Sequence, residues 1–237
     1  MRKVSYVALT AALLAVIIYL CSCASGGGVI DTTDPILPSP EIKEGVVDPD
    51  TRAITITKDN VSLTMEHWSK TRLNRKYTTV DMRSPFYFLE SWDQALRTEA
   101  FYLTIKNDTP RKVIVTFKES ICEDDREYKY KPLEINDFKY KFTIRKMLDL
   151  KTKRGLELAR RILLNEVLGP KREVPAGKSR SGFLAYPAPS TGAEKVWVTV
   201  VLEKEPELAT GAYERAEFRF DYIQDRVLRA REPATQR

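Results

Sequence analysis

The chain has 237 residues, with 39 lysines and arginines against 33 aspartates and glutamates, so its formal net charge is +6 at pH 7. This excess is mild, and the basic residues lack the clustering of a nucleic-acid-binding surface, which argues against a nucleic acid as partner. A single histidine and three cysteines leave few side chains for a metal centre, and no metal or cofactor is expected.

The first 22 residues have the pattern of an export signal. Arg2 and Lys3 form a basic start, the stretch from Val4 to Leu20 is almost entirely apolar, and small residues follow. A retained membrane helix is the competing interpretation, since this stretch is close to the roughly 17 residues that can span a bilayer. Lys or Arg anchors usually flank a retained span, whereas Ser and Gly follow here, so a signal peptide over residues 1–22 is favoured.

The residues Leu20-Cys21-Ser22-Cys23 resemble the lipobox of bacterial lipoproteins. The resemblance implies that Cys23 is acylated and becomes the first residue of the mature chain, which is anchored to a membrane. Cys21 is the competing acceptor, but it would place Leu20 where the family has a small residue. Ala24, in place of Asp, implies sorting to the outer membrane with the domain facing the periplasm, while exposure on the cell surface stays open.

The mature chain has no cysteine pair for a disulfide. Acylation would occupy Cys23 and leave Cys122 without an intramolecular partner, despite an oxidising compartment. Removing Arg2 and Lys3 leaves 37 basic against 33 acidic residues, a net charge of about +4. A hydrophobic core must therefore hold the domain together, and the chain is long enough to bury one.

Residues 23–50 are predicted to form a flexible tether behind the acylated cysteine. This stretch has three consecutive glycines, four prolines, six acidic residues against Lys43 alone, and no aromatic residue. A sandwich domain is expected over residues 51–230, followed by a disordered tail over residues 231–237.

Alternation of apolar and polar residues predicts β-strands throughout this domain. The predicted strands are Ile54 to Thr57, Val61 to Trp68, Phe86 to Leu89, Phe101 to Lys106, Val113 to Phe117, Glu127 to Tyr130, Phe138 to Ile144, Ser181 to Tyr186, Val196 to Leu202 and Phe218 to Tyr222. The strands 101–106 and 113–117 flank an Asn-Asp-Thr-Pro turn, which predicts an antiparallel hairpin. Many short strands favour a β-sandwich over a parallel sheet.

One amphipathic helix is predicted over residues 151–168. Apolar residues recur at helical spacing, with Gly169 and Pro170 at the expected end. The basic residues of its polar face include Lys153, Arg154, Arg160 and Arg161. Such a helix either covers one end of the sandwich or docks on a membrane surface or a partner.

The Pro-Ala-Gly turn at 175–177, the strand from Ser181 to Pro187 and the earlier strand Leu103 to Asn107 resemble telokin-like, immunoglobulin-fold domains of bacterial lipoproteins. The resemblance implies an immunoglobulin-like antiparallel β-sandwich. It implies no activity, because such folds host many functions.

Few residues suggest catalysis. His67 is the only histidine, and we expect a partly buried or surface side chain rather than a ligand or a general base. Cys122 lies among acidic residues that disfavour its thiolate, so a structural role is expected. The cluster from Glu123 to Asp125 could attract Ca²⁺ but lacks the ligand spacing of a dedicated loop, which favours a solvated turn.

Aromatic residues are frequent before the strongest strands, and packing in the core is their expected role. Exposed, they would offer an anchor surface for a protein or a glycan. The candidates for such a surface are Trp68, Tyr87 and Trp92.

Two hypotheses about function follow. The first is a non-catalytic lipoprotein that docks on another envelope protein. The second is a glycan-binding module or a carboxylate-dependent envelope hydrolase, using Glu66 with Asp81 or Asp93. The absence of a recognisable catalytic motif favours the first hypothesis.

Overall fold

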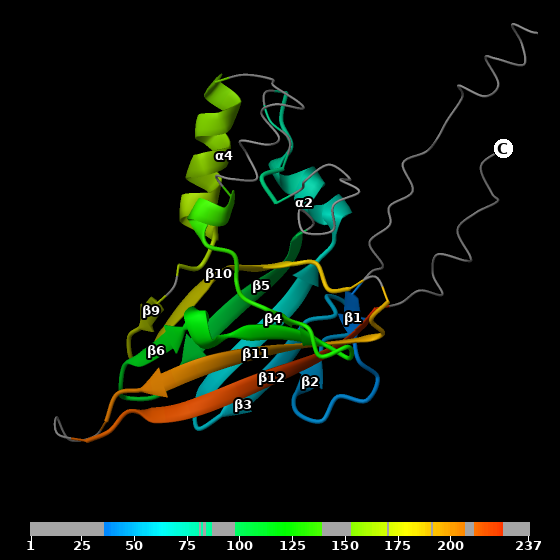
Figure 1. Ribbon diagram of the computed structural model, residues 1–237. Helices are drawn as coiled ribbons and strands as arrows, with labels where there is room; N and C mark the ends of the chain where they lie inside the picture. Colours follow the sequence, from blue (N-terminus) through cyan, green and yellow to red (C-terminus); the bar gives the residue numbers. More distant parts are fainter. Residues whose placement is uncertain are drawn as a thin grey trace, which may run out of the picture. The chain divides into compact units, whose positions relative to one another are not determined.

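The computed structural model describes residues 36–80, 82, 84–86, 98–138, 153–169, 171–190, 192–206 and 211–224. These residues form two antiparallel β-sheets, which pack face to face, and two helices at one end of the strands (Figure 1). The predicted fold, a mainly β sandwich with an amphipathic helix near residues 151–168, is confirmed.

The first sheet, called sheet A, has seven strands. In hydrogen-bonded order they are β1 (Ile36–Pro38), β12 (Glu214–Gln224), β11 (Lys195–Lys204), β6 (Val113–Thr116) and β9 (Lys171–Val174), with β7 (Ile121–Asp124) also on β11 and β8 (Lys129–Tyr130) on β7. The second sheet, called sheet B, has five strands: β10 (Lys178–Pro187), β5 (Thr98–Asn107), β4 (Val61–Trp68), β3 (Ile54–Lys58) and β2 (Val46–Val47). The remaining elements are helix α2 (Lys70–Tyr77), helix α4 (Lys153–Glu166) and the 3₁₀ turn η2 (Phe117–Glu119).

The main core lies between the two sheets, where the alternating apolar residues of both sheets meet. The Tyr222 hydroxyl donates a hydrogen bond to the backbone carbonyl of Met65 at 3.3 Å, across the interior. The rings of Phe101 and Tyr222 lie 5.2 Å apart between centroids. Each large apolar side chain buried here contributes roughly 1.5–3 kcal/mol, so this interior is the main source of stability.

The predicted tether over residues 23–50 is too long. Ile36–Pro38 pairs with the end of β12, and Val46–Val47 pairs with β3 at the edge of sheet B. The sandwich therefore begins before its predicted start at residue 51. The predicted signal peptide and the predicted tail over residues 231–237 lie outside the described residues.

The predicted hairpin of strands 101–106 and 113–117 is wrong. The chain forms both strands, but β5 belongs to sheet B and β6 to sheet A, so the turn between them is a crossing from one sheet to the other. The apolar pattern is compatible with both arrangements, because Ile105 and Val113 face the same interior from opposite sheets.

The buried side chain of Asn107 organises this crossing. Its amide nitrogen donates to the backbone carbonyls of Arg111 at 2.8 Å and Val174 at 2.9 Å. A third bond reaches the carbonyl of Pro175 at 3.2 Å. Its amide oxygen accepts from the backbone nitrogen and the hydroxyl of Thr109, at 3.1 and 2.7 Å. One amide thus connects the turn after β5 to the end of β9.

Helix α2 was not predicted from the sequence. Ser69 caps it by accepting a hydrogen bond from the Arg72 backbone nitrogen at 3.3 Å. Leu73 and Tyr77, four residues apart, are buried on one face, and extended backbone at Thr78 ends the helix. A serine followed by two apolar residues at helical spacing is therefore the signal that could have revealed it.

The strand predicted over residues 138–144 is wrong at its first residue, because Phe138, like residues 135–137, is helical. The remainder of that strand lies outside the described residues, as do residues 87–89 of the strand predicted from Phe86.

The described domain contains its own core. Every buried member of the main core lies between Ile36 and Tyr222, and every buried member of a second cluster lies between Trp68 and Ala185. A chain of residues 24–237, called the anchor-free chain, keeps both clusters and so contains the apolar contacts needed for folding.

We predict that Asn107→Ala lowers the free energy of unfolding of the anchor-free chain by about 3 kcal/mol, since it leaves several buried backbone groups without partners. Urea unfolding measures the change. The matched control is Asp108→Ala in the same turn, which removes only an exposed ion pair with Lys106 and should change stability by less than about 1 kcal/mol. Equal losses for the two variants would contradict the role assigned to Asn107.

Candidate functional site

Both helices pack over the outer face of sheet B near one end of its strands. They share a second apolar cluster, to which α2 contributes Leu73 and Tyr77, α4 contributes Leu163, and β10 contributes Phe183. Lys76 of α2 also forms an ion pair with a residue of α4 (3.9 Å). The structure therefore brings two helices from distant parts of the sequence to the same end of the domain (Figure 1).

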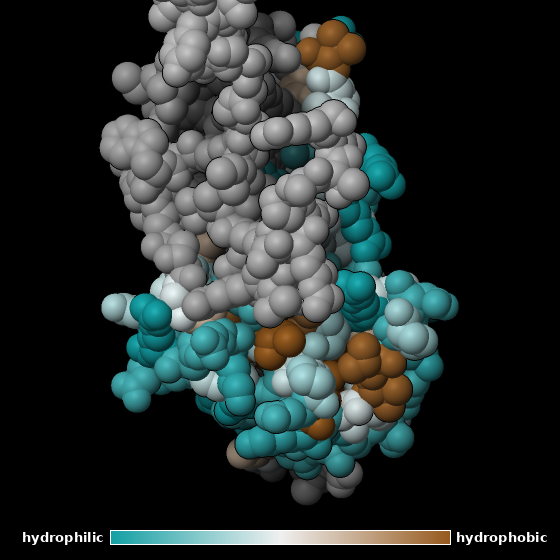
Figure 2. All heavy atoms as spheres, turned by 90° about the vertical axis from the view of Figure 1, so that its right-hand side faces the viewer, coloured by the Kyte–Doolittle hydropathy of each residue, from teal (hydrophilic) through white to brown (hydrophobic). Residues whose placement is uncertain are grey.

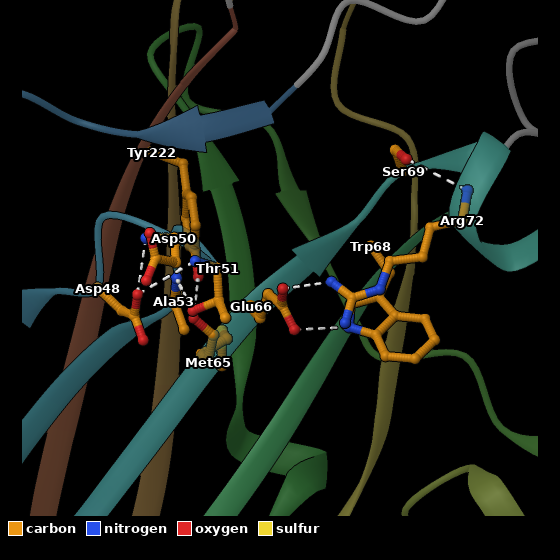
Figure 3. Close-up of polar contacts among 10 residues, drawn as sticks. All are labelled: Asp48, Asp50, Thr51, Ala53, Met65, Glu66, Trp68, Ser69, Arg72 and Tyr222. Carbon is orange, nitrogen blue, oxygen red and sulfur yellow. Dashed lines mark hydrogen bonds and ion pairs between the residues drawn. The ribbon is translucent and has the colours of Figure 1, made fainter.

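Trp68, a predicted binding residue, belongs to this cluster and is only 9% exposed. Its indole nitrogen donates to the Glu66 carboxylate at 2.8 Å, and the same carboxylate pairs with Arg72 (Figure 3). The guanidinium carbon of Arg72 lies 3.9 Å from the indole centroid, and the Lys76 amine lies 4.9 Å from it. Trp68 is thus a buried support for cations rather than an exposed platform.

The other predicted aromatic binding residues, Tyr87 and Trp92, lie outside the described residues, as does Cys23. Tyr77 is buried in the second cluster, and Tyr102 packs beside it, half-buried. The described aromatic residues of this region therefore pack inside the domain instead of forming a surface.

A basic hollow, called the α2 hollow, lies beside α2. Its volume is about 530 Å³, and its lining includes Ser69, Thr71, Arg72, Arg75 and Lys76. Arg75 is exposed, and no described acidic side chain lies within ion-pair distance of it. The arrangement offers several cationic donors and two hydroxyl groups to an anion.

The basic residues predicted on α4 are placed on its surface. Arg154, Arg160 and Arg161 are exposed, and none has an ion-pair partner among the described residues. Lys153 is the first residue of the helix, but its side chain is not among those that the structure describes. One turn beyond the arginine pair, Leu164 is 47% exposed.

Leu164 borders a second hollow, called the α4 hollow, of about 550 Å³. Its apolar lining includes Phe117, Leu133, Ile135, Leu164, Val167 and Leu168. Lys118 and Lys131 also line it, and neither pairs with an acidic side chain in the described part of the chain. A mostly apolar concavity with a few charged groups is typical of binding sites.

The surface turned toward the viewer in Figure 2 differs in hydropathy from the largely apolar lining of the α4 hollow. Its described part is mostly hydrophilic, with small separate hydrophobic groups. Exposed large apolar residues of the described chain are Val46, Val47, Val80, Tyr128, Leu164 and Tyr213. Among them, Leu164 combines exposure with a neighbouring hollow.

The carboxylates proposed for hydrolysis are not assembled into a site by the described residues. Glu66 is engaged with Trp68 and Arg72. Asp81 and Asp93 lie outside the described residues, so no distance between the predicted pair is defined.

His67 has a specific carboxylate partner that the sequence does not reveal. Its Nε2 atom lies 2.8 Å from the Glu99 carboxylate, and both side chains are largely buried. This pairing satisfies two polar groups near the end of the main core. Within the described residues, no group of three or more potential ligands is arranged to hold a metal ion.

Cys122 is fully buried in β7 and forms part of the main core. Burial raises the pKa of its thiol, and the neighbouring Glu99 and Asp124 raise it further. The thiolate needed for nucleophilic attack is therefore disfavoured.

The acidic residues around Cys122 are used by the fold itself. Asp124 is buried and accepts from the backbone nitrogens of Arg126 at 3.0 Å and Tyr128 at 3.1 Å. It also accepts from the Tyr130 hydroxyl at 2.9 Å and the Ser190 nitrogen at 3.1 Å. This carboxylate therefore connects the β7–β8 turn to the loop before β11.

The remaining members of this acidic cluster have partners too. Glu123 pairs with Lys129 at 3.9 Å, and Asp125 accepts from the Glu194 nitrogen at 3.1 Å. These contacts are consistent with the predicted turn, whose acidic side chains interact with nearby residues.

No described helix is long and apolar enough to cross a membrane. Comparison of the chain with protein-family models, curated proteins and solved structures found no match. The resemblance to lipoproteins with telokin-like domains therefore stays a prediction.

We predict that Asp124→Asn lowers the free energy of unfolding at pH 7 by about 2 kcal/mol, because one acceptor is replaced by a donor facing other donors. Burial raises the pKa of Asp124, but the hydrogen bonds from Ser190, Tyr130, Tyr128 and Arg126 together lower it below its usual value. A lowered folded-state pKa contributes stability above the unfolded value of about 3.9, and this contribution is lost as the pH falls through the folded-state pKa.

The difference between wild type and Asp124→Asn should therefore shrink below about pH 4. Urea unfolding of the anchor-free chain across this range measures it. Glu123→Gln, which alters the half-exposed neighbour, is the matched control and should show little change at pH 7. A pH-independent difference for Asp124→Asn would be inconsistent with the assigned role.

Proposed function

We propose that this protein is an outer-membrane lipoprotein, anchored through acylated Cys23, whose sandwich domain docks on another envelope protein without catalysing a reaction. The observation that most supports a docking role is the surface beside α4. There an exposed Leu164 borders the largely apolar α4 hollow, and the nearby cations lack ion-pair partners among the described residues.

The α4 surface defines the chemistry of its partner. Leu164 lies one helical turn after Arg160 and Arg161, so the three side chains lie on neighbouring parts of the helix surface. Lys118 and Lys131 line the hollow, against the single acidic lining residue Glu134. A fitting partner presents apolar side chains to the hollow and carboxylates to the surrounding cations, which combines a buried centre with a charged rim.

The proposed anchor limits how far the domain can lie from the membrane. Only residues 24–35, twelve residues, separate Cys23 from β1. Fully extended they span roughly 45 Å, and as a flexible coil roughly 20 Å. The short connection confines the domain, and thus its encounters with partners, to the layer next to the bilayer.

The anchor is tested by acylation of the full chain in a bacterial host. We predict that wild type incorporates an alkyne-tagged fatty acid and loses its signal peptide, whereas Cys23→Ala does neither. Cys21→Ala, which alters the competing acceptor, is the control and should behave as wild type. Persistent labelling of Cys23→Ala would refute the assignment.

The docking surface is tested with a photoactivatable residue in place of Leu164 in the membrane-anchored protein. We predict one defined protein adduct, which is lost when Arg160→Glu and Arg161→Glu reverse the neighbouring charges. The same probe at Tyr213, which is 48% exposed on another part of the domain, should not form that adduct. The proposed docking role would be contradicted if the probe at Tyr213 formed the same adduct equally well, or if the adduct from position 164 survived charge reversal.

The control for overall charge is Lys178→Glu with Arg180→Glu, two exposed residues of β10. This variant should retain the adduct. Thermal unfolding of each variant distinguishes loss of docking from loss of folding.

A further inference from the structure

Helix α2 has an unusual charge composition. Its charged residues are Lys70, Arg72, Arg75 and Lys76, and it contains no acidic residue. Among the described residues, Glu66 pairs with Arg72, and Glu166 pairs with Lys76. Arg72, Arg75 and Lys76 line the α2 hollow, and no described acidic side chain lies within ion-pair distance of Arg75, so positive charge is in excess there.

Two of these cations are held in position by the core. Arg72 lies over the Trp68 indole while pairing with Glu66, which restricts its long side chain (Figure 3). The Lys76 amine lies 4.9 Å from the same indole centroid and 4.8 Å from that of Tyr77. Preorganised cations lose less conformational entropy on binding an anion than freely rotating ones do.

The strand directions place α2 at the end of the domain where its first described strand, β1, lies. Ile36 pairs with Gln224 at the end of β12. Two residues earlier, the Tyr222 hydroxyl bonds to the Met65 carbonyl, near the end of β4. Helix α2 follows β4 directly after Ser69. The start of the described domain and the basic helix therefore share one end.

The opposite end is identified by different contacts. The Lys204 amine pairs with Asp59 at 2.6 Å, which joins the end of β11 to the β3–β4 turn. Lys178 and Arg180, at the start of β10, also lie toward that end. Lys178 is the strand partner of Asn107, the last residue of β5, and Asn107 is opposite Val61, which follows the β3–β4 turn. These two exposed cations provide a comparison that is distant from α2.

We propose that α2 binds anionic phospholipid head groups and so turns its end of the domain toward the bilayer. Arg72, Arg75 and Lys76 would donate to lipid phosphates, with the hydroxyls of Ser69 and Thr71 at the same hollow. This site is separate from the α4 surface. The binding itself does not require the anchor, while the orientation rests on the proposed acylation of Cys23.

The test uses the anchor-free chain and vesicle sedimentation. Vesicles of phosphatidylcholine with phosphatidylglycerol should bind the protein, vesicles of phosphatidylcholine alone should not, and added salt should release it. Arg75→Gln with Lys76→Gln should weaken binding about 25-fold, since each basic residue near an anionic surface contributes about fivefold. Lys178→Gln with Arg180→Gln removes the same charge at the opposite end and should leave binding within about twofold.

Three outcomes would overturn the proposal. They are equal binding to both vesicle types, equal weakening by the two double variants, and full competition by millimolar inorganic phosphate, which would indicate a site for a free anion. Thermal unfolding of each variant checks that the fold is intact, and Arg75→Gln alone, at an exposed position, provides a milder variant if Lys76→Gln destabilises the domain. Acylation of Cys23 is measured separately, so failure of the anchor and failure of lipid binding give different results.

Discussion

The aromatic side chains on the outer face of sheet B determine where both helices lie. Trp68 and Phe183 project from neighbouring parts of this sheet, away from the main core, and would be exposed to water if nothing covered them. Leu73 and Tyr77 of α2 and Leu163 of α4 cover them in the second cluster. Burial of this apolar area is the driving force that brings two helices far apart in the sequence to one end of the domain.

Both candidate surfaces depend on that packing. The buried face of α2 leaves its cations around the α2 hollow, and the buried face of α4 leaves its arginines and Leu164 exposed. The Trp68 ring connects core packing with surface charge, because it packs in the second cluster while Arg72 and Lys76 lie over it. Core packing and surface charge are therefore coupled at this end, and a change in one alters the other.

The polar interactions divide into two kinds. Asn107 and Asp124 are buried and have several partners each, so they hold the crossing between the sheets and the turn after β7. Arg154, Arg160 and Arg161 of α4 are exposed and have no ion-pair partner among the described residues. Buried polar groups are costly unless fully bonded, which identifies the first kind as structural, whereas exposed cations remain available to a partner.

Local patterns in the sequence were sufficient for the sandwich, for most of its strands and for α4, because the periods of two and 3.6 residues report directly which side chains face a core. They were insufficient for the crossing at Asn107, since the apolar faces of β5 and β6 fit one hairpin or two opposed sheets equally well. The same limit applied to the segment from Ile36 to Val47, whose prolines and acidic residues resemble a linker although it pairs with β12 and β3. Strand partners, the His67–Glu99 pair and the two hollows depend on contacts between distant residues, and only the tertiary structure decides those.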